Sequence, residues 1–510
     1  MTRDPLIRLF HDAAIADNFA GGGGASEGIR MALGRDPDVA INHDREALAM
    51  HKVNHPHTRH YPEDVFDVDP VDACDGRGCA LAWFSPDCTY HSKARGAKPF
   101  RDRNRARRVR GLAWVMVKWA KCVRPTVMFM ENVEEFKDWC PLRADGTPDP
   151  KKRGASFRRF LAALRNVGYA VEHRELRASE FGAPTSRKRL FLIARCDGRP
   201  IVWPSVTHGK RTALKPFHTA AECIDFSIPI PSIFLTPKEA REWAREHGCD
   251  APRRPLAAAT LRRIARGVTR FVLNSPKPFI VEDYAPTLIQ TSYGERKGQA
   301  PRTLDLFAPL GTIVAGGIKH SLVAAFLAKH NGGHEATGQR VTDPIHTIVC
   351  RENKALVTSH MLKLRGGLSD HVNTSQDLRE PVPTLTAGGT HIAEVRAFLM
   401  KWYGTKQDGC VLDAPIDTLT TKARFGLVTV LIDGETYVIY DIGMRMLTPR
   451  ELYRAQGFRE DYEIEHGVDI ETGLKMRLTK KAQTRLVGNS VPPHLAAAIV
   501  HANVRAYLAA

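Results

Sequence analysis

The sequence predicts an α/β fold: a doubly wound, mostly parallel sheet into which an irregular second domain is inserted. The first observation is that short apolar runs of strand length alternate with helical patterns over residues 13–195. The second is a change near Arg199, where prolines become frequent and the alternation stops until a helical pattern returns at Leu447. These observations divide the chain into a first part of the sheet domain over 1–198, an inserted domain over 199–441 and a completing part over 442–510.

Composition narrows the class of protein. A chain of 510 residues with 43% apolar content can form a sizeable core, and a net charge of +18 favours a polyanionic partner, with nucleic acid the first candidate. The ten cysteines are mostly scattered, which disfavours a secreted disulfide framework, and Cys74 and Cys79 are too far apart for the usual zinc pair. No apolar run has membrane-spanning length, and no signal peptide opens the chain. We expect a cytoplasmic protein with no metal and no membrane contact.

The first predicted strand, residues 13–16, leads into a glycine-rich turn. The turn has the sequence DNFAGGGGASEG over 17–28, and the helix that follows it stops at Gly34. A strand, a glycine turn and a helix are typical of a nucleotide-binding opening, because glycine lets the backbone approach a ligand closely. The spacing of the dinucleotide fingerprint is not met, since its third glycine falls on Ser26 or Glu27, and this disfavours a dehydrogenase.

The second predicted strand, residues 39–41, ends in Asn42-His43-Asp44 and is followed by a helix over 47–53. An acidic side chain at such a strand end usually holds a ribose hydroxyl. Asp44 is the candidate for this contact, because Asn42 is neutral. The stretch Glu63-Asp64-Val65 lies in the next crossover.

A cysteine follows the next predicted strand, residues 80–84. Pro86 ends this strand, so Cys88 lies just past its carboxyl end, where open α/β sheets bind their ligands. A cysteine in such a place is more often a small buried hydrophobe, and only the surrounding motifs favour a reactive role. Residues 93–110 then carry nine basic side chains against one acidic one, Asp102, a bias that favours contact with phosphates over a solvated helix face.

A carboxylate follows the neighbouring strand, residues 126–130, which comes after a helix over 112–123. Because the carboxyl ends of parallel strands meet at one edge of a sheet, Glu131 and Cys88 are plausible partners, although a carboxylate here can also cap a helix. The remaining elements of this part are a helix over 161–167, the stretch PTSRKR over 184–189 and a strand over 190–194.

The middle of the chain contains a weak repeat built on proline and threonine. Successive threonines of the repeat are 35, 37 and 34 residues apart; they are Thr312, Thr347, Thr384 and Thr418. Their near-even spacing favours a recurring strand–turn unit over chance pairing in loops.

Regular structure returns near the carboxyl end. Thr448 is a natural N-cap, Glu451 completes a capping box, and Gly457 ends the helix that they begin. Beyond this helix lie the stretch GNSVPP over 488–493 and an apolar helix over 495–507.

The order of these motifs resembles that of the DNA (cytosine-5)-methyltransferase family, whose members use S-adenosylmethionine. The resemblance covers residues 13–195 and 442–510, whereas the middle matches only in position, as the family's variable target-recognition domain. It implies a Rossmann-like methyltransferase sheet, S-adenosylmethionine as cofactor, double-stranded DNA as partner and a monomer. The activity it implies is that of a DNA (cytosine-5-)-methyltransferase.

The resemblance also implies roles for individual residues. The catalytic positions are Cys88 as nucleophile, Glu131 as acid, and the paired arginines Arg187 and Arg189. The cofactor positions are Asp17, Phe19, Ala20, Gly21, Gly23, Gly24, Asp64, Val65, Pro86, Leu112, Asn489, Ser490 and Val491, with Asp44 as the substitute at the ribose. Contacts with DNA are expected at Ser92, Arg105, Arg107 and Arg108.

Four positions depart from the family pattern. Asp87 stands where proline usually precedes the nucleophile, and Thr89 stands where glutamine usually follows it. Asn42 stands at the ribose glutamate, and Thr185 stands at the glutamine before the arginine pair. Counting back from Ser92 still gives the cysteine the spacing of the family.

Two other classes of function remain open. One is a DNA-binding protein that keeps this fold without catalysis, for which the departures at Asp87 and Asn42 leave room. The other is a nucleotide-dependent oxidoreductase, which the glycine spacing and the pair of Cys88 and Glu131 disfavour. Methyl transfer to duplex DNA separates the enzyme from the inactive binding protein.

Overall fold

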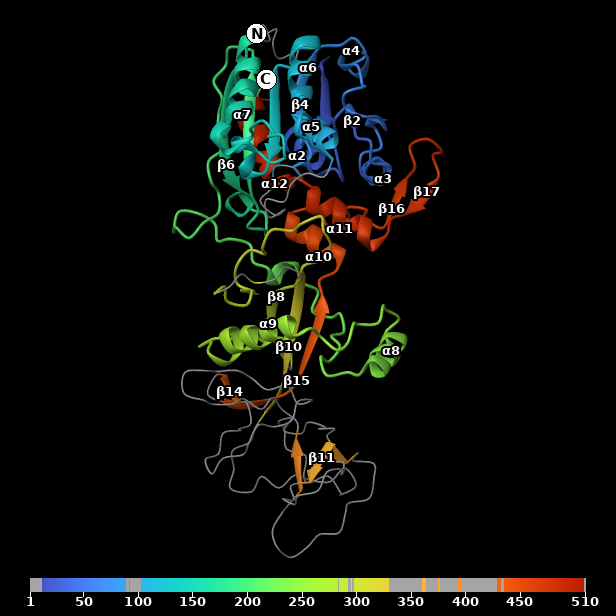
Figure 1. Ribbon diagram of the computed structural model, residues 1–510, viewed down its shortest axis with the longest axis vertical. Coiled ribbons are helices and arrows are strands. Elements are labelled where there is room, and N and C mark those ends of the chain that lie inside the picture. The colour runs from blue at the N-terminus through green and yellow to red at the C-terminus, as the bar shows by residue number, and fades with distance from the viewer. Residues whose placement is uncertain are drawn as a thin grey trace, which may run out of the picture. The chain divides into compact units, whose positions relative to one another are not determined.

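The structure, a computed structural model, describes residues 12–88, 91, 102–282, 284–291, 295, 298–329, 360–363, 375–376, 392–395, 429–432 and 435–508 (Figure 1). The chain forms two compact units. Unit 1 comprises Met1–Asp225, Leu306–Lys319 and Leu447–Ala510, and unit 2 comprises Phe226–Asp305 and His320–Met446. These limits differ from the sequence-derived boundaries after 198 and 441, because residues 199–225 and 306–319 belong to the unit of the parallel sheet and residues 442–446 belong to unit 2.

Unit 1 is built on a seven-stranded sheet with the strand order β3-β2-β1-β4-β5-β7-β6 (Figure 1). Its strands are β1 (Ala14–Asn18), β2 (Val39–Ile41), β3 (Arg59–Tyr61), β4 (Cys79–Phe84), β5 (Val127–Asn132), β6 (Ala170–Arg177) and β7 (Lys188–Arg195). Strands β1 to β5 pair in parallel, and β7 runs antiparallel to both β5 and β6. The prediction of a doubly wound, mostly parallel sheet is therefore confirmed.

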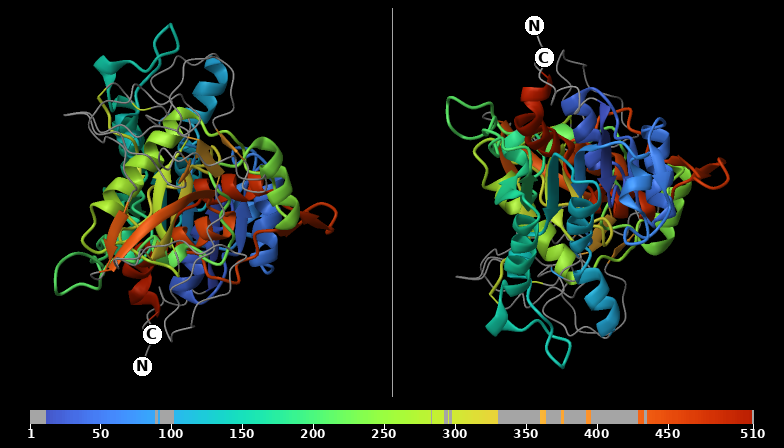
Figure 2. Two further views of the ribbon diagram at one scale, coloured as in Figure 1. Left: turned by 90° about the horizontal axis from the view of Figure 1, so that it is seen from below. Right: turned by 90° about the horizontal axis from the view of Figure 1, so that it is seen from above.

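Helices cover both faces of this sheet. The α-helices of unit 1 are α2 (Gly24–Leu33), α3 (Arg45–Asn54), α4 (Pro70–Ala73), α5 (Arg103–Arg110), α6 (Trp114–Cys122), α7 (Ala155–Asn166), α10 (Pro449–Gln456), α11 (Lys480–Asn489) and α12 (Pro493–Leu508). Successive side chains of β4 enter different cores: Phe84 packs with Trp119 of α6, and Trp83 packs in the cluster that includes Ile499 of α12. Figure 2 shows α12 and the pair α6 and α7 on opposite sides of the sheet.

The shorter elements of unit 1 complete this frame. They are the 3-10 helices η2 (Glu134–Asp138), η3 (Pro150–Lys152), η4 (Ala178–Phe181) and η5 (Ala221–Cys223), and the hairpin strands β16 (His466–Val468) and β17 (Lys475–Arg477). The hairpin packs closely on α3, since a Cβ atom at Gly467 would lie 2.7 Å from the carbonyl carbon of Ala49.

Helix α10 begins and ends where the sequence predicts. The Thr448 side chain accepts from the backbone N–H of Glu451, and the Glu451 carboxylate accepts from the backbone N–H of Thr448. Gly457 adopts the left-handed conformation, with φ of 90°, that commonly ends a helix.

Unit 2 is built on an antiparallel sheet with the order β14-β15-β10-β8-β9. Its elements are α8 (Pro237–Glu246), α9 (Ala258–Val268), the π-helix η6 (Thr269–Leu273), β8 (Tyr284–Gln290), β9 (Thr303–Leu304), β10 (His320–Lys329), β11 (His360–Lys363), β12 (Ser375–Gln376), β13 (Ile392–Val395), β14 (Thr429–Ile432) and β15 (Glu435–Met446). Ile264 of α9 packs with Ile289 of β8 and Val323 of β10. Strands β12, β11 and β13 form a separate antiparallel sheet.

A strand of unit 1 was missed by the predictions from sequence, and most of the predicted repeat cannot be compared with the structure. Strand β6 was not predicted, because it is a largely exposed edge strand whose residues, AVEHRELR, contain no apolar run. Of the repeat threonines, Thr312 lies outside any strand, whereas Thr347, Thr384 and Thr418 lie outside the described residues. Within the described part of the chain, no helix is both long enough and apolar enough to cross a membrane.

Candidate active site

The carboxyl ends of β1, β4 and β5 lie side by side and hold the loop that carries Cys88. Backbone N–H of Ser85 donates to the carbonyl of Asn18 at 3.3 Å, and Nδ2 of Asn132 donates to the carbonyl of Pro86 at 3.0 Å. Cys88 follows two residues later and is partly exposed. The cysteine is therefore held at the sheet edge by the two strands that flank β4.

A buried cluster of charges lies at the same edge. Glu131 is the last residue but one of β5, and Oε1 of its carboxylate is 3.2 Å from Nε of Arg189 and 3.9 Å from Nη2 of Arg187. Both arginines reach it because β7 pairs with β5 in antiparallel register. The side chains of Glu131 and Arg187 are 8% and 4% exposed, so these charges interact with little screening by water.

Backbone carbonyls fix Arg187 from two distant parts of the chain. Its Nη1 donates to the carbonyl of Ile313 at 3.1 Å and to the carbonyl of Gly488 at 3.0 Å. Burial, with Arg189 nearby, lowers the pKa of Arg187 to about 9, so the guanidinium stays charged at neutral pH. Arg187 thus links β7 to the segment 306–319 and to the end of α11.

The same cluster sets the state of the thiol. Burial raises the pKa of Cys88, and the Glu131 carboxylate raises it further. Arg189 and Arg187 lower that pKa but do not outweigh the other two effects. The resting thiol is therefore protonated at neutral pH, and a neighbouring positive charge would favour the thiolate.

The glycine turn between β1 and α2 contains buried polar atoms without partners. Gly21 and Gly23 have φ of 53° and 87°, a conformation that L side chains rarely adopt. Oδ2 of Asp17 accepts from Ser26 at 2.7 Å, but its Oδ1 and both amide atoms of Asn18 have no hydrogen-bond partner among the described residues. Burial raises the pKa of Asp17 to about 7. A polar ligand or water can satisfy such unpaired buried atoms.

The carboxyl-terminal part of unit 1 closes against this turn. A Cβ atom at Gly24 would lie 2.0 Å from Oγ of Ser490 and 2.2 Å from the carbonyl oxygen of Val491. Gln456 of α10 holds that segment by donating to the carbonyl of Ser490 at 2.7 Å. Asn489 is exposed. Residues from the two ends of the printed sequence are thus brought together around Gly24.

The predicted ribose contact already has other partners. Asp44 caps α3 by accepting from the N–H groups of Glu46 and Ala47, and it is paired with Arg485 of α11. Asn42, at the end of β2, accepts from the N–H of Asp44 at 2.9 Å.

The other predicted cofactor residues lie around the same strand ends. Asp64 accepts from the N–H of Phe66 and is paired with Arg108 of α5 at 2.6 Å. Phe19 has a positive φ of 65°, and the N–H of Ala20 donates to the carbonyl of Ile41 at 3.1 Å. The apolar members of the set are Val65 and Pro86, which are buried, and Leu112, which is partly buried.

The basic segment after Cys88 is only partly described. Ser92 lies outside the described residues, as does the side chain of Arg105. Arg107 and Arg108 are exposed on α5. Arg110, in contrast, is buried and donates to the carbonyl of Cys140 at 2.7 Å, so not every arginine of the segment faces solvent.

The segment 306–319 was not expected at this site. Besides the bond from Arg187 to Ile313, a Cβ atom at Gly488 would lie 2.3 Å from the backbone nitrogen of Ala315. The threonine repeat had placed this segment in the middle domain. The signal that was available is Gly488 itself, since a glycine within a helix commonly marks a close backbone approach.

Comparison with known proteins identifies the family. Residues 13–224 and 337–505 match the family of C-5 cytosine-specific DNA methylases. The chain belongs to this family. The match covers the strand ends and both segments that meet around Gly24, and it agrees with the resemblance that the sequence motifs suggested.

Individual relatives match over shorter stretches. The type II methyltransferase M.SacI of Streptomyces achromogenes is 28% identical over 175 residues, which are 33% of this chain and 42% of the relative. M.DdeI of Desulfomicrobium norvegicum is 30% identical over 222 residues, 42% of this chain and 48% of the relative. The matches thus span less than half of either relative. The crystal structure of S. pombe Dnmt2 methyltransferase is similar with a TM-score of 0.44 and 14% identity, covering 96% of this chain and 98% of that one.

Proposed function

We propose that the protein transfers a methyl group from S-adenosylmethionine to C5 of a cytosine in double-stranded DNA. The observation that carries the proposal is the cluster of Cys88, Glu131, Arg187 and Arg189 at one sheet edge, in a member of the C-5 cytosine-specific DNA methylase family. A thiol beside a buried carboxylate and two guanidiniums suits a reaction in which charge builds up on a polar ring.

Cys88 is the proposed nucleophile. Cytosine C5 is a poor nucleophile until the thiolate adds to C6, which makes the ring an enamine that can attack an electrophilic methyl group. The proton at C5 then leaves, and the electrons of that C–H bond expel the thiolate from C6. The raised pKa of Cys88 means that the thiolate forms only when a positive charge or a proton acceptor is brought to the site.

Glu131 and Arg189 are proposed to bind the base. A protonated Glu131, or one sharing a proton with N3, stabilises the negative charge that addition at C6 pushes into the ring. Its distance of 3.2 Å to Nε of Arg189 allows the guanidinium to contact the base oxygen beside it. Arg187, bonded to two backbone carbonyls, is proposed to hold Glu131 in place.

The glycine turn is proposed to hold the methyl donor, and the residues present fit it. S-adenosylmethionine, when bound, supplies an electrophilic sulfonium methyl group. Asp17 and Asn18 have buried polar atoms that a polar ligand can satisfy, and the close approach of Ser490 to Gly24 makes the opposite wall. Asp64 and Val65 are proposed at the adenine, and Asp44 at the ribose only if its bond to Arg485 gives way.

The substrate base must leave the helix stack to reach Cys88, because the chemistry cannot be done on a stacked base. Exposed Arg107 and Arg108 are proposed to contact phosphates of the duplex. Unit 2 is proposed to be the target-recognition domain, since its antiparallel sheet interrupts the chain of the catalytic unit.

The proposal is tested by trapping. Duplex DNA in which 5-fluorocytosine replaces cytosine should form a covalent complex with the protein in the presence of S-adenosylmethionine, because the C5 fluorine cannot leave. Cys88→Ser should abolish both the complex and methylation while largely retaining DNA binding. Cys122→Ser, which alters an exposed thiol, is the matched control and should leave both intact.

Two results would overturn the proposal. One is a covalent complex through another cysteine, such as Cys74 or Cys79, or an active Cys88→Ser variant. The other is a calorimetric experiment in which the protein binds a nicotinamide dinucleotide but does not bind S-adenosylmethionine. A protein that binds duplex DNA without methylating it would be the inactive binding protein instead.

A further inference from the structure

One buried hydroxyl joins the segment after α10 to the glycine turn. Tyr462 is fully buried, and its hydroxyl donates to the carbonyl of Gly22 at 2.8 Å. Burial raises the pKa of Tyr462 well above its usual value, so the hydroxyl keeps its proton and remains a donor. A Cβ atom at Gly23 would lie 2.1 Å from the same hydroxyl oxygen. The hydroxyl therefore lies directly against the backbone of the turn.

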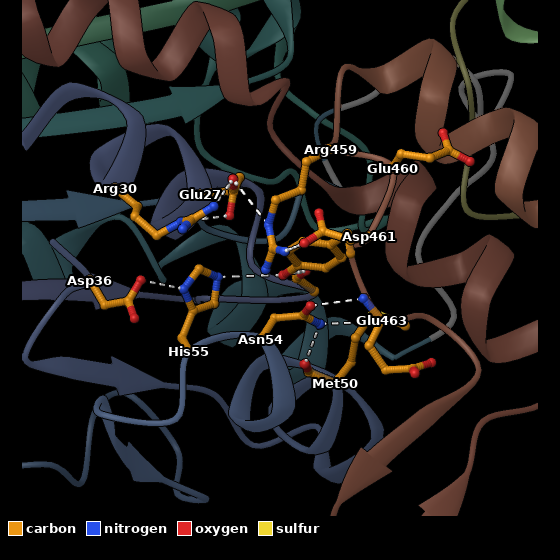
Figure 3. Close-up of polar contacts among 12 residues, drawn as sticks. Glu27, Arg30, Asp36, Met50, Asn54, His55, Arg459, Glu460, Asp461 and Glu463 are labelled. Atoms are coloured by element: carbon orange, nitrogen blue, oxygen red, sulfur yellow. Dashed lines mark hydrogen bonds and ion pairs between the residues drawn. The ribbon is translucent and has the colours of Figure 1, made fainter. Parts of the chain in front are cut away.

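The backbone around Tyr462 is fixed by side chains of two helices. Asn54, the last residue of α3, donates to the carbonyl of Glu463 at 2.8 Å and accepts from its N–H at 2.8 Å (Figure 3). Arg450 of α10 donates to the carbonyl of Tyr462 at 2.8 Å. The position of the tyrosine is thus set by α3 and α10, independently of its own hydroxyl.

Charged groups hold the ring and tie it to α2. The guanidinium of Arg459 lies over the Tyr462 ring, 5.3 Å from its centroid. Arg459 is paired with Asp461 at 2.7 Å and approaches Glu27 of α2 to 3.5 Å, and Glu27 is also paired with Arg30 (Figure 3). The ring cannot leave its place without breaking these contacts to the first turn of α2.

The turn depends on few bonds, so each one determines its shape. The N–H of Gly23 donates to the carbonyl of Ala20 at 3.0 Å, and the N–H of Glu27 donates to the carbonyl of Gly23 at 2.8 Å. The same peptide, between Gly22 and Gly23, donates to Ala20 through its N–H and accepts from the hydroxyl of Tyr462 through its carbonyl. Glycines resist rotation of the peptide less than any other residue, and the hydroxyl of Tyr462 adds a partner from outside the turn to the one bond within it.

We propose that Tyr462 is a positioning residue for the methyl donor: its hydroxyl fixes the peptide between Gly22 and Gly23 so that the turn presents one preformed shape to S-adenosylmethionine. This inference rests on the proposed function of the glycine turn. Tyr462 touches neither the reacting atoms nor DNA in this role. Its loss acts on cofactor affinity through pre-organisation of the turn.

Tyr462→Phe removes one hydroxyl and leaves a buried carbonyl unpaired. The dissociation constant for S-adenosylmethionine should rise about tenfold, the factor that corresponds to one buried hydrogen bond. The KM for S-adenosylmethionine should rise in parallel, whereas kcat at saturation and the affinity for DNA should change much less. Calorimetry with S-adenosylmethionine and with its demethylated product measures the first effect.

Tyr453→Phe is the matched control. Tyr453 is also buried, its ring stacks on that of Tyr462 with centroids 6.2 Å apart, and burial raises its pKa as well. Its hydroxyl, however, donates to the sulfur of Met50 at 3.0 Å and to no backbone carbonyl of the turn. The same substitution at this position should leave the affinity for S-adenosylmethionine unchanged.

Hydrogen exchange of the ligand-free protein gives a second readout. Amides from Gly23 to Glu27 should exchange faster in Tyr462→Phe than in the wild type, and not in Tyr453→Phe. Asn54→Ala keeps the hydroxyl but releases the backbone beside it, so it should shift the same amides and the affinity in the same direction, by less. Asn54→Ala also provides the test if Tyr462→Phe does not fold.

The outcomes separate this inference from the proposed function. If the wild type binds no S-adenosylmethionine, the proposed function fails. If the wild type binds it and Tyr462→Phe binds it equally well, with unchanged amide exchange, the positioning role alone is refuted. An equal loss in Tyr462→Phe and Tyr453→Phe would also refute it, because the effect would then come from general packing.

Discussion

One buried charged residue of unit 2 is bonded differently from two buried acidic residues of unit 1. In unit 1, Oε1 of Glu131 has ion pairs but no hydrogen bond of good geometry among the described residues, and Oδ1 of Asp17 has no hydrogen-bond partner there. In unit 2, the guanidinium of buried Arg254 donates to the backbone carbonyls of Pro231 and Ser232. The guanidinium of Arg254 thus holds its own chain, whereas Glu131 and Asp17 keep incompletely bonded oxygen atoms.

This difference separates structural from chemical roles. A buried charge costs several kcal/mol of desolvation unless hydrogen bonds and partners offset it, which Arg254 achieves within unit 2. Charges left incompletely bonded persist where a ligand completes them. We therefore expect chemistry to depend on unit 1 and choice of DNA sequence to depend on unit 2.

The largest expected effect is on sequence choice. Replacing residues 226–305 and 320–446 by those of a relative, while keeping 306–319, should move methylation to a different sequence. The retained segment preserves the hydrogen bond that Arg187 donates to the carbonyl of Ile313. The affinity of a protein for its specific DNA site exceeds its affinity for nonspecific DNA by roughly 10³–10⁷-fold. The original site should therefore lose essentially all methylation. Sequencing DNA for 5-methylcytosine after expression measures this.

One outcome of the exchange of unit 2 would contradict the assignment of sequence choice to that unit. A chimera that still methylates the original site would show that specificity lies in unit 1. A second chimera that exchanges 306–319 as well is the matched control. It should be less active, because the segment that supplies one of the two carbonyls bonded to Arg187 is then no longer matched to unit 1.

The second effect concerns the thiol and its neighbour. Glu131→Gln should lower the methylation rate by about 10²–10⁴-fold, the usual contribution of a positioned acid or base. The same change should make Cys88 react faster with iodoacetamide at pH 8, because the carboxylate that raises the pKa of Cys88 is gone. Arg189→Gln should slow alkylation for the opposite reason. Peptide mapping identifies the modified cysteine.

Glu134→Gln is the control for this pair of measurements. Glu134 lies three residues further along, is partly exposed and is paired with Lys188. It should change neither methylation nor alkylation. Slower alkylation of Cys88 in Glu131→Gln would mean that the carboxylate does not act on the thiol as described.

The third effect is on stability. The pKa of Asp17 is raised to about 7 by burial, so the folded protein binds this proton more tightly than the unfolded chain. The contribution of this group to the free energy of unfolding is complete below about pH 4. It is lost as the pH rises towards 7, and the loss amounts to up to about 4 kcal/mol. Asp17→Asn should abolish that loss, so melting temperatures of variant and wild type should diverge between pH 5 and 8. Melting temperatures that change with pH in the same way in both proteins would contradict this prediction.

Asp145→Asn is the matched control for stability. Asp145 is exposed, and hydrogen bonds from Thr147 lower its pKa. A carboxylate with a lowered pKa loses its stabilising effect only as pH falls below its ordinary value near 4. The melting temperature of Asp145→Asn should therefore follow that of the wild type between pH 5 and 8.

The smallest effect is expected at α5. Arg107→Gln and Arg108→Gln should each weaken binding to all duplexes alike by a few fold, and each should reduce the slope of log K against log salt by about 0.9. Only Arg108→Gln should also change the affinity for S-adenosylmethionine, because Arg108 is paired with Asp64. Binding titrations at several salt concentrations measure both. A loss confined to the target sequence would assign these arginines to base recognition.

Much of unit 1 follows from local sequence signals. Strand ends, the glycine turn and the capping residues of α10 are encoded within a few positions. The caps lie where they were predicted, the ends of β1 and β5 lie two residues later, and the turn is confined to the first part of the predicted stretch 17–28. The proximity of Cys88 and Glu131 follows from the rule that parallel strands align their carboxyl ends. These inferences need no knowledge of distant contacts.

Other parts of the site depend on contacts that sequence patterns do not encode. The bond from Arg187 to Ile313 joins residues 126 positions apart, and that from Tyr462 to Gly22 joins residues 440 apart. Neither partner differs locally from an ordinary core or loop residue. The pairing of Asp44 with Arg485 was missed for the same reason, although Asp44 was recognised as a polar strand-end residue.

The 440 positions that separate Gly22 from Tyr462 along the chain also affect the order in which the protein is synthesised and folds. A ribosome adds about 5–20 residues per second, so the glycine turn leaves it roughly 20–90 s before the tyrosine that completes its bonding. Throughout that interval α2 also lacks α12, the helix that packs with it over the sheet. The nascent chain therefore exposes apolar surface and an incomplete turn for far longer than a local element needs to fold, a period in which chaperones have their opportunity to bind it.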